Sequence, residues 1–145
     1  MSETTASRTV LARSTTPRGR GARIALRGLQ IGLALFYAVA SALPKLIAHP
    51  SAAETFDRLG WGSTGMYAIG VLELAGAVAL LIPVLQSVAA IALSALMVGA
   101  FIVSVTALGG ENAATPLILV VPLALIAWAR RGSLTQLRRP ARRDA

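Results

Sequence analysis

The sequence predicts an all-α membrane protein, an antiparallel bundle of four transmembrane helices with a short interfacial helix between the first two spans. Hydrophobic residues make up 55% of the chain and charged residues only 14%, a composition far from that of a soluble domain. Several uncharged runs approach the length of about 20 residues that a span requires. The basic residues gather at the two ends, as in multi-pass membrane proteins.

The membrane domain is expected over residues 24–131, with spans at about 26–46, 66–85, 87–108 and 113–129. The uncharged run between Glu73 and Glu111 is too long for one span, and Pro83 and Gln86 interrupt it, so it is divided into spans two and three. Short connections near residues 83–87 and 109–112 predict antiparallel neighbours.

Of the 14 basic residues, only Lys45 and Arg58 lie away from the chain ends. The others precede the first span or follow the last: Arg8, Arg13, Arg18, Arg20, Arg23, Arg27, Arg130, Arg131, Arg138, Arg139, Arg142 and Arg143. Lys and Arg beside a span are retained in the cytoplasm, so both termini are expected there, which agrees with an even number of spans. We expect a multi-pass protein of the inner (plasma) membrane, with anionic lipid headgroups as partners of its arginines. The arginine- and alanine-rich, lysine-poor composition indicates a bacterial, GC-rich source.

Both ends of the chain are predicted to be basic tails. Residues 1–23 have no apolar periodicity and are expected to be disordered, and residues 132–145 form the C-terminal tail. A transit peptide, or signal cleavage after Ala38-Val39-Ala40, is an alternative, but cleavage would leave an odd number of spans. Nucleic-acid binding is an alternative interpretation of the net charge of +8. No aromatic residues interleave with the arginines, so no nucleic-acid partner is expected.

The segment between spans one and two should contain its own helix, over Ala52–Leu59. Ser51 and Glu54 have the spacing of a capping box, and Gly60 suits a helix stop. One face is apolar and the other charged, and Trp61 follows at a depth typical of interfacial indoles. The helix either anchors this loop in the interface or gates the bundle as a lid.

Small residues four apart predict close contacts between the spans, because helices in lipid associate through such residues. The candidate sets are Gly28 with Gly32, Ala34 with Ala38 and Ala42, Ala75 with Ala79, and Ala95 with Gly99.

The chain offers little chemistry of its own. Zero cysteines exclude disulfide exchange, thiolate nucleophiles and iron–sulfur ligation. His49 is the only histidine, which excludes paired-histidine ligation within one chain. We therefore predict no catalytic residue, no metal site and no intrinsic cofactor.

Glu73 is the first candidate site residue, because it lies inside an uncharged stretch, where a carboxylate costs a few kcal/mol unless it is paired or functional. It should lie about 10 Å below the outer edge of span two, within reach of Lys45 at the end of span one. A Lys45–Glu73 ion pair would either lock the fold or hold a proton or polar headgroup. Alternatively, Lys45 extends to water.

Three segments resemble DoxX-like proteins. Residues 36–46 (FYAVASALPKL) are similar to the family's F-x-x-S-G-L-x-K-L, and residues 69–76 (IGVLELAG) to its I-G-x-x-E-L-x-G. Residues 90–100 resemble its third span, and the likeness covers Gly28 to Trp128. Ala42 departs from the pattern, since the family commonly has glycine there. Lys45 and Glu73 are the residues that match.

The resemblance implies an accessory subunit of a quinone-linked redox or oxidative-stress membrane complex, at most one subunit of a membrane oxidoreductase. Lys45 and Glu73 would then lie near a quinone headgroup or proton site, with Tyr37 as a neighbour. The implied partners are a redox enzyme or further copies of the chain. Two alternatives are a small transporter or proton-coupled permeation unit, in which Glu73 titrates, and a purely structural membrane partner.

Overall fold

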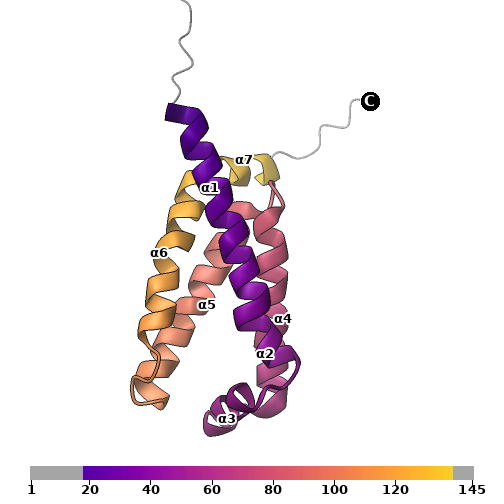
Figure 1. Cartoon of the computed structure of the whole chain (residues 1–145), viewed down its shortest axis with the longest axis vertical. Coiled ribbons are helices and arrows are strands. Elements are labelled where there is room, and N and C mark those ends of the chain that lie inside the picture. Colours follow the sequence, from indigo (N-terminus) through magenta and orange to yellow (C-terminus); the bar gives the residue numbers. More distant parts are fainter. Residues whose placement is uncertain (1–17, 139–145) are drawn as a thin grey trace, which may run out of the picture.

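The structure, a computed structural model, describes residues 18–138, and all of its regular elements are helices (Figure 1). Seven of them are α-helices, and one π-helical segment lies between the first two. In chain order they are α1 (Arg18–Leu35), the π-helix η1 (Phe36–Ala42), α2 (Leu43–Leu46), α3 (Pro50–Arg58), α4 (Gly62–Leu81), α5 (Gln86–Ala107), α6 (Ala114–Ala129) and α7 (Gly132–Arg138). The all-α prediction is confirmed for the described residues.

Three helices are long and apolar enough to cross a membrane: the continuous rod Gly19–Leu46, made of α1, η1 and α2, and the helices α4 and α5. Helix α6 is equally apolar but has only 16 residues. At 1.5 Å per residue it is about 24 Å long, whereas the hydrocarbon core of a bilayer is about 30 Å thick. The structure therefore supports three of the four predicted spans by length.

The boundaries differ from the prediction at both ends of the chain. Residues 18–23, expected to be disordered, form the start of α1, where Arg23 Nε donates to the carbonyl of Gly19 at 3.2 Å, one turn earlier. Residues 132–138, expected to be tail, form α7. The rest of both predicted tails, residues 1–17 and 139–145, lies outside the described part. The expected break between spans two and three is present, between Leu81 and Gln86.

The long helices run up and down, and the chain enters and leaves at the same end of the bundle (Figure 1). Helix α4 contacts the α1–η1–α2 rod and also α5, which packs along α6. Helix α3 lies across one end of the bundle and α7 lies at the other; we call these the α3 end and the α7 end.

The apolar core fills the half of the bundle nearer the α7 end. Side chains from α1, η1, α4, α5 and α6 meet there, including Leu33, Tyr37, Leu80, Leu93, Leu123 and Ile126. The half nearer the α3 end has no comparable cluster among the described residues.

Close helix contacts occur at glycines other than those predicted from spacing. A Cβ at Gly76 would lie 2.6 Å from Leu93 Cδ2, where α4 meets α5, and one at Gly70 would lie 3.0 Å from Lys45 Cβ, where α4 meets α2. A methyl group at either position would force its neighbour to move, so the absence of a side chain favours both close approaches.

The predicted packing glycines Gly28, Gly32 and Gly99 have no neighbouring atom within 4 Å of an added Cβ, so that prediction was wrong. Ala75 and Ala95 are exposed as well. A four-residue spacing identifies a helix face but not whether another helix covers it. The prediction was more accurate for the set Ala34, Ala38 and Ala42, since Ala34 and Ala42 are buried in the bundle.

The predicted capping box of α3 does not form. The N-cap is His49, whose Nδ1 accepts from the Ser51 backbone N–H at 3.4 Å, and Pro50 is the first helical residue. Proline favours this position because its φ is preset and it has no N–H to satisfy. Helix α3 ends as predicted before Gly60, which has a φ of +70°. Phe56 is buried on its apolar side.

The π-helix η1 interrupts the first rod where it approaches α4. A π-helix has i→i+5 hydrogen bonds and is common at functional sites. Tyr37 and Ala42, five residues apart, are both fully buried. The wide turn therefore places them on the same, inward-facing side.

Candidate functional site

The predicted ion pair is present in the structure. Lys45 Nζ lies 2.7 Å from Glu73 Oε2. The Glu73 side chain is only 3% exposed and that of Lys45 18%, so both charges are largely withdrawn from solvent. Lys45 comes from α2 and Glu73 from the middle of α4, and the two helices approach closely because Gly70 has no side chain.

Ser41 completes the coordination of the ammonium group. Lys45 Nζ also donates to the carbonyl oxygen of Ser41 at 2.9 Å and to its hydroxyl at 3.2 Å. Three acceptors thus match the three donors of a lysine. Sequence reasoning missed Ser41, although its position four residues before Lys45 is the signal that identifies it, since residues four apart are neighbours on a helix.

Tyr37, the third predicted site residue, lies in the apolar core and is fully buried. Its hydroxyl has no hydrogen-bond partner among the described residues. Its ring contacts that of Phe36 edge to face, with centroids 5.9 Å apart. The structure therefore brings Lys45 and Glu73 into direct contact and places Tyr37 in the apolar core.

A cavity of about 650 Å³ lies beside the ion pair, in the half of the bundle nearer the α3 end. One wall comes from the first rod and α4, and includes Lys45 and Glu73; the other comes from α5 and α6. Most of the lining is apolar, with side chains such as Phe36, Ile69, Val103 and Leu119. The volume is within the range of about 300–1,000 Å³ that small-molecule sites have.

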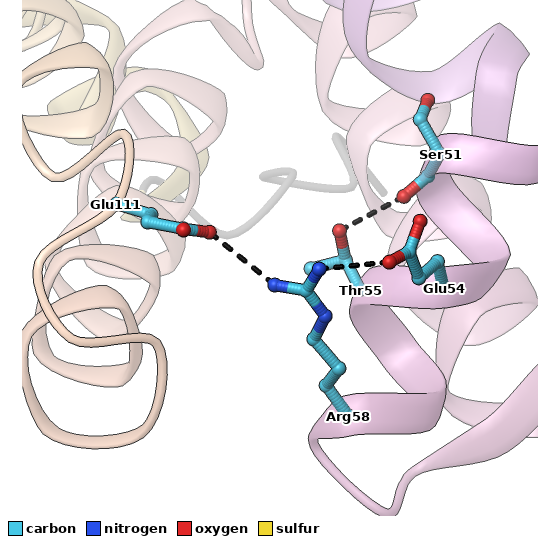
Figure 2. A network of polar contacts seen from close by, with 5 residues as sticks. All are labelled: Ser51, Glu54, Thr55, Arg58 and Glu111. Atoms are coloured by element: carbon cyan, nitrogen blue, oxygen red, sulfur yellow. Dashed lines mark hydrogen bonds and ion pairs between the residues drawn. The ribbon is translucent and has the colours of Figure 1, made fainter.

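Helix α3 contributes lining residues at one end of this cavity, and an ion pair joins it to the α5–α6 connection (Figure 2). Arg58 of α3 donates to Glu54 at 2.7 Å and to Glu111, in the α5–α6 connection, at 3.4 Å. Within α3, the hydroxyl of Thr55 donates to the carbonyl of Ser51 at 2.9 Å. The hydrogen bond to Glu54 and the charges of Glu54 and Glu111 raise the pKa of Arg58, so the bridge keeps its cation.

The arrangement is suited to binding a molecule with a polar head and an apolar body. The ion pair provides donors and acceptors at one point of an otherwise apolar space. Within residues 18–138, no group of three or more His, Asp or Glu side chains is placed to hold a metal ion.

The sequence model of the DoxX-like family matches residues 28–130. The match runs from α1 to the residue that follows α6, and so includes the ion pair and both walls of the cavity. Comparisons with curated proteins and with solved structures gave no match. The family match confirms the resemblance seen in the sequence, and it covers most of the chain. This chain therefore belongs to the DoxX-like family and is a membrane protein.

Proposed function

We propose that the protein is an accessory subunit of a quinone-linked redox or oxidative-stress complex and that its large cavity receives a quinone headgroup. The observation that carries this proposal is the position of the Lys45–Glu73 pair on the wall of an apolar cavity of about 650 Å³. A buried ion pair alone is weak evidence of function, because it can be purely structural. A pair beside an apolar space large enough for a ligand supports a binding role.

The residues present suit a quinone. The apolar walls would accept the ring and the start of the isoprenoid tail, and Lys45 would donate to a carbonyl oxygen. Its bond to the Ser41 hydroxyl is the longest of its three, at 3.2 Å, and is the one most readily exchanged for a ligand. Glu73 would take up or release a proton beside that oxygen. When bound, a quinone supplies reversible electron and proton transfer.

The proposal includes four crossings of the plasma membrane, with both termini in the cytoplasm. Helix α6 would be the short fourth span, accommodated by local thinning of the bilayer. Trp61 near the α3 end and Trp128 near the α7 end are 49% and 65% exposed, which suits indoles at the two membrane interfaces. The arginines beside α1 and α6 would then face the cytoplasm, in what we take to be a bacterial cell.

A permeation unit is less well supported than a binding subunit. The core side chains that fill the α7 half leave the large cavity confined to the other half, so one chain does not provide a path across the bundle. The catalytic cofactor of the proposed complex would come from a redox-enzyme partner.

Tryptophan fluorescence provides the test, because Trp61 lines the cavity and quinones quench indole emission. The protein with Trp128→Phe, purified in mild detergent, would be titrated with a short-chain ubiquinone. We expect saturable quenching by the quinone. Its apparent affinity should fall about tenfold or more in Lys45→Met and in Glu73→Gln, because each variant loses a charge-assisted hydrogen bond. Asp57→Asn, at an exposed acid of α3 that does not line the cavity, is the matched control and should bind normally. Saturable quenching that neither pair variant alters would overturn the proposed site.

A further inference from the structure

The α7 end carries a second, separate cavity, of about 310 Å³ and predominantly polar. We propose that it binds the phosphate group of an anionic phospholipid headgroup. This site is independent of the quinone proposal and shares no lining residue with the first cavity. Its lining residues are Arg27, Pro83, Gln86, Ala129, Arg130, Gly132 and Ser133. The set contains two arginines and no acid, which leaves a positive charge to be matched.

Arg130 is held in place by three side chains. Its backbone carbonyl accepts hydrogen bonds from the hydroxyls of Ser87 and Ser133. Its Nη2 donates to Gln30 Oε1 at 3.2 Å, and Gln30 is itself only 2% exposed. Gln30 in turn donates to the carbonyl of Leu80 at 3.5 Å, in the last turn of α4. The guanidinium is therefore positioned before any ligand arrives.

The same guanidinium has an unsatisfied donor. Arg130 Nε is buried and has no hydrogen-bond partner among the described residues. A buried donor without a partner is costly and needs an explanation. Arginine presents its donors as a planar fork that matches the oxygens of phosphate, often through two bonds at once. A phosphate oxygen in the cavity would satisfy Nε, and the exposed Arg27 would contact the group from α1.

Backbone polarity at this end also favours an anion. Gln86, which lines the cavity, is the first residue of α5, and no side chain caps that helix. The free N–H groups and positive dipole end of a helix attract phosphate. Helix α6 ends nearby with the opposite polarity, but its terminal carbonyl, that of Arg130, already accepts two hydroxyl groups.

The surroundings favour a lipid as the source of the phosphate. Trp128 is 65% exposed near the cavity, and the guanidinium of Arg131 lies 5.2 Å from the centroid of its ring. Exposed indoles with adjacent basic residues are typical of the headgroup region of a membrane. A zwitterionic headgroup would bring its own cation close to Arg27 and Arg130, so an anionic headgroup such as that of phosphatidylglycerol is preferred.

The test is native mass spectrometry of the full-length protein, delipidated in detergent and titrated separately with phosphatidylglycerol, phosphatidylcholine and inorganic phosphate. We expect phosphatidylglycerol to bind with one-to-one stoichiometry and about tenfold more tightly than phosphatidylcholine. Arg130→Gln and Arg27→Gln should each weaken that binding about tenfold, as expected for losing a charge-assisted bond. Arg131→Gln removes the same charge one residue away and should leave binding unchanged.

The outcomes separate a built site from general charge attraction. Equal weakening in Arg27→Gln, Arg130→Gln and Arg131→Gln, or equal binding of the two lipids, would overturn the proposal. Binding of inorganic phosphate without phosphatidylglycerol would overturn the lipid assignment. If Arg130→Gln fails to fold, Arg27→Gln decides, because Arg27 is exposed and makes no side-chain hydrogen bond within the described residues.

Discussion

Removing one charge of the buried Lys45–Glu73 pair should destabilise the protein by an amount that depends on which charge remains. In Lys45→Met, the carboxylate of Glu73 stays in place with its side chain only 3% exposed and without its cation. In Glu73→Gln, the ammonium of Lys45 keeps both bonds to Ser41 and is 18% exposed, so it retains partners and a route to solvent.

The structure therefore ranks the costs. Lys45→Met should lower the free energy of unfolding by about 3–5 kcal/mol, the usual cost of leaving a buried charge unpaired. Glu73→Gln should cost less, about 1–3 kcal/mol, because the remaining charge is still hydrogen-bonded. The double variant Lys45→Met/Glu73→Leu should return to within about 1 kcal/mol of the unaltered protein, since apolar side chains of similar volume replace a buried pair at little cost.

Unfolding by sodium dodecyl sulfate in mixed micelles, followed by circular dichroism, would give the three free energies and the coupling between the two positions. Quinone binding measured on the same double variant distinguishes the roles, because a purely structural pair would leave binding intact while a binding pair would lose it. Single variants that each cost less than about 1 kcal/mol, or a double variant as unstable as the sum of both, would refute the reasoning.

Two further predictions follow from the packing and from helix α3. Gly76→Ala should destabilise the protein by about 1–3 kcal/mol, as overpacking does, because its methyl group would lie 2.6 Å from Leu93 Cδ2; Gly99→Ala, with open space around it, is the control in the same unfolding assay, and equal effects would contradict the packing argument. Arg58→Gln removes the bridge to the far wall of the cavity and should speed maleimide labelling of Ser104→Cys, which is at the cavity in a chain without other cysteines; equal labelling rates would show that α3 does not restrict access.

The long helices and the ion pair could be predicted because both depend on simple regularities of a single chain. Comparing the length of each uncharged run with the thickness of the bilayer locates the helices. The rise of 1.5 Å per residue then places Glu73 at a depth that Lys45 can reach. Neither inference needs to know how the helices are arranged around one another. Glu73 and Lys45 were therefore accessible from the sequence, whereas Ser41 was overlooked although its spacing from Lys45 was visible.

Features that depend on the neighbouring helix could not be predicted in this way. Gly76 and Gly28 look alike in the sequence, but only the first faces another helix closely. The polar cluster around Arg130 joins residues from α1, α5 and the segment after α6. In the sequence, Arg130 looked like one of the many arginines that set the orientation of the chain in the membrane. The start of α3 was misplaced for a local reason, since Pro50 prevailed over the capping pattern that begins at Ser51.

The π-helix limits which changes in chain length the first rod can tolerate. An α-helix turns about 100° per residue, whereas a π-helix, with its i→i+5 hydrogen bonds, turns less per residue and holds an additional residue in the same rotation. If residues 36–42 took α geometry at unchanged length, everything that follows would rotate relative to Leu33, and Lys45 would leave the sector that faces Glu73 although neither charged residue had been altered. The ion pair therefore depends on the number of residues upstream as well as on the identity of its members, and a DoxX-like relative that keeps the pair without the wide turn is expected to have one residue fewer in this segment.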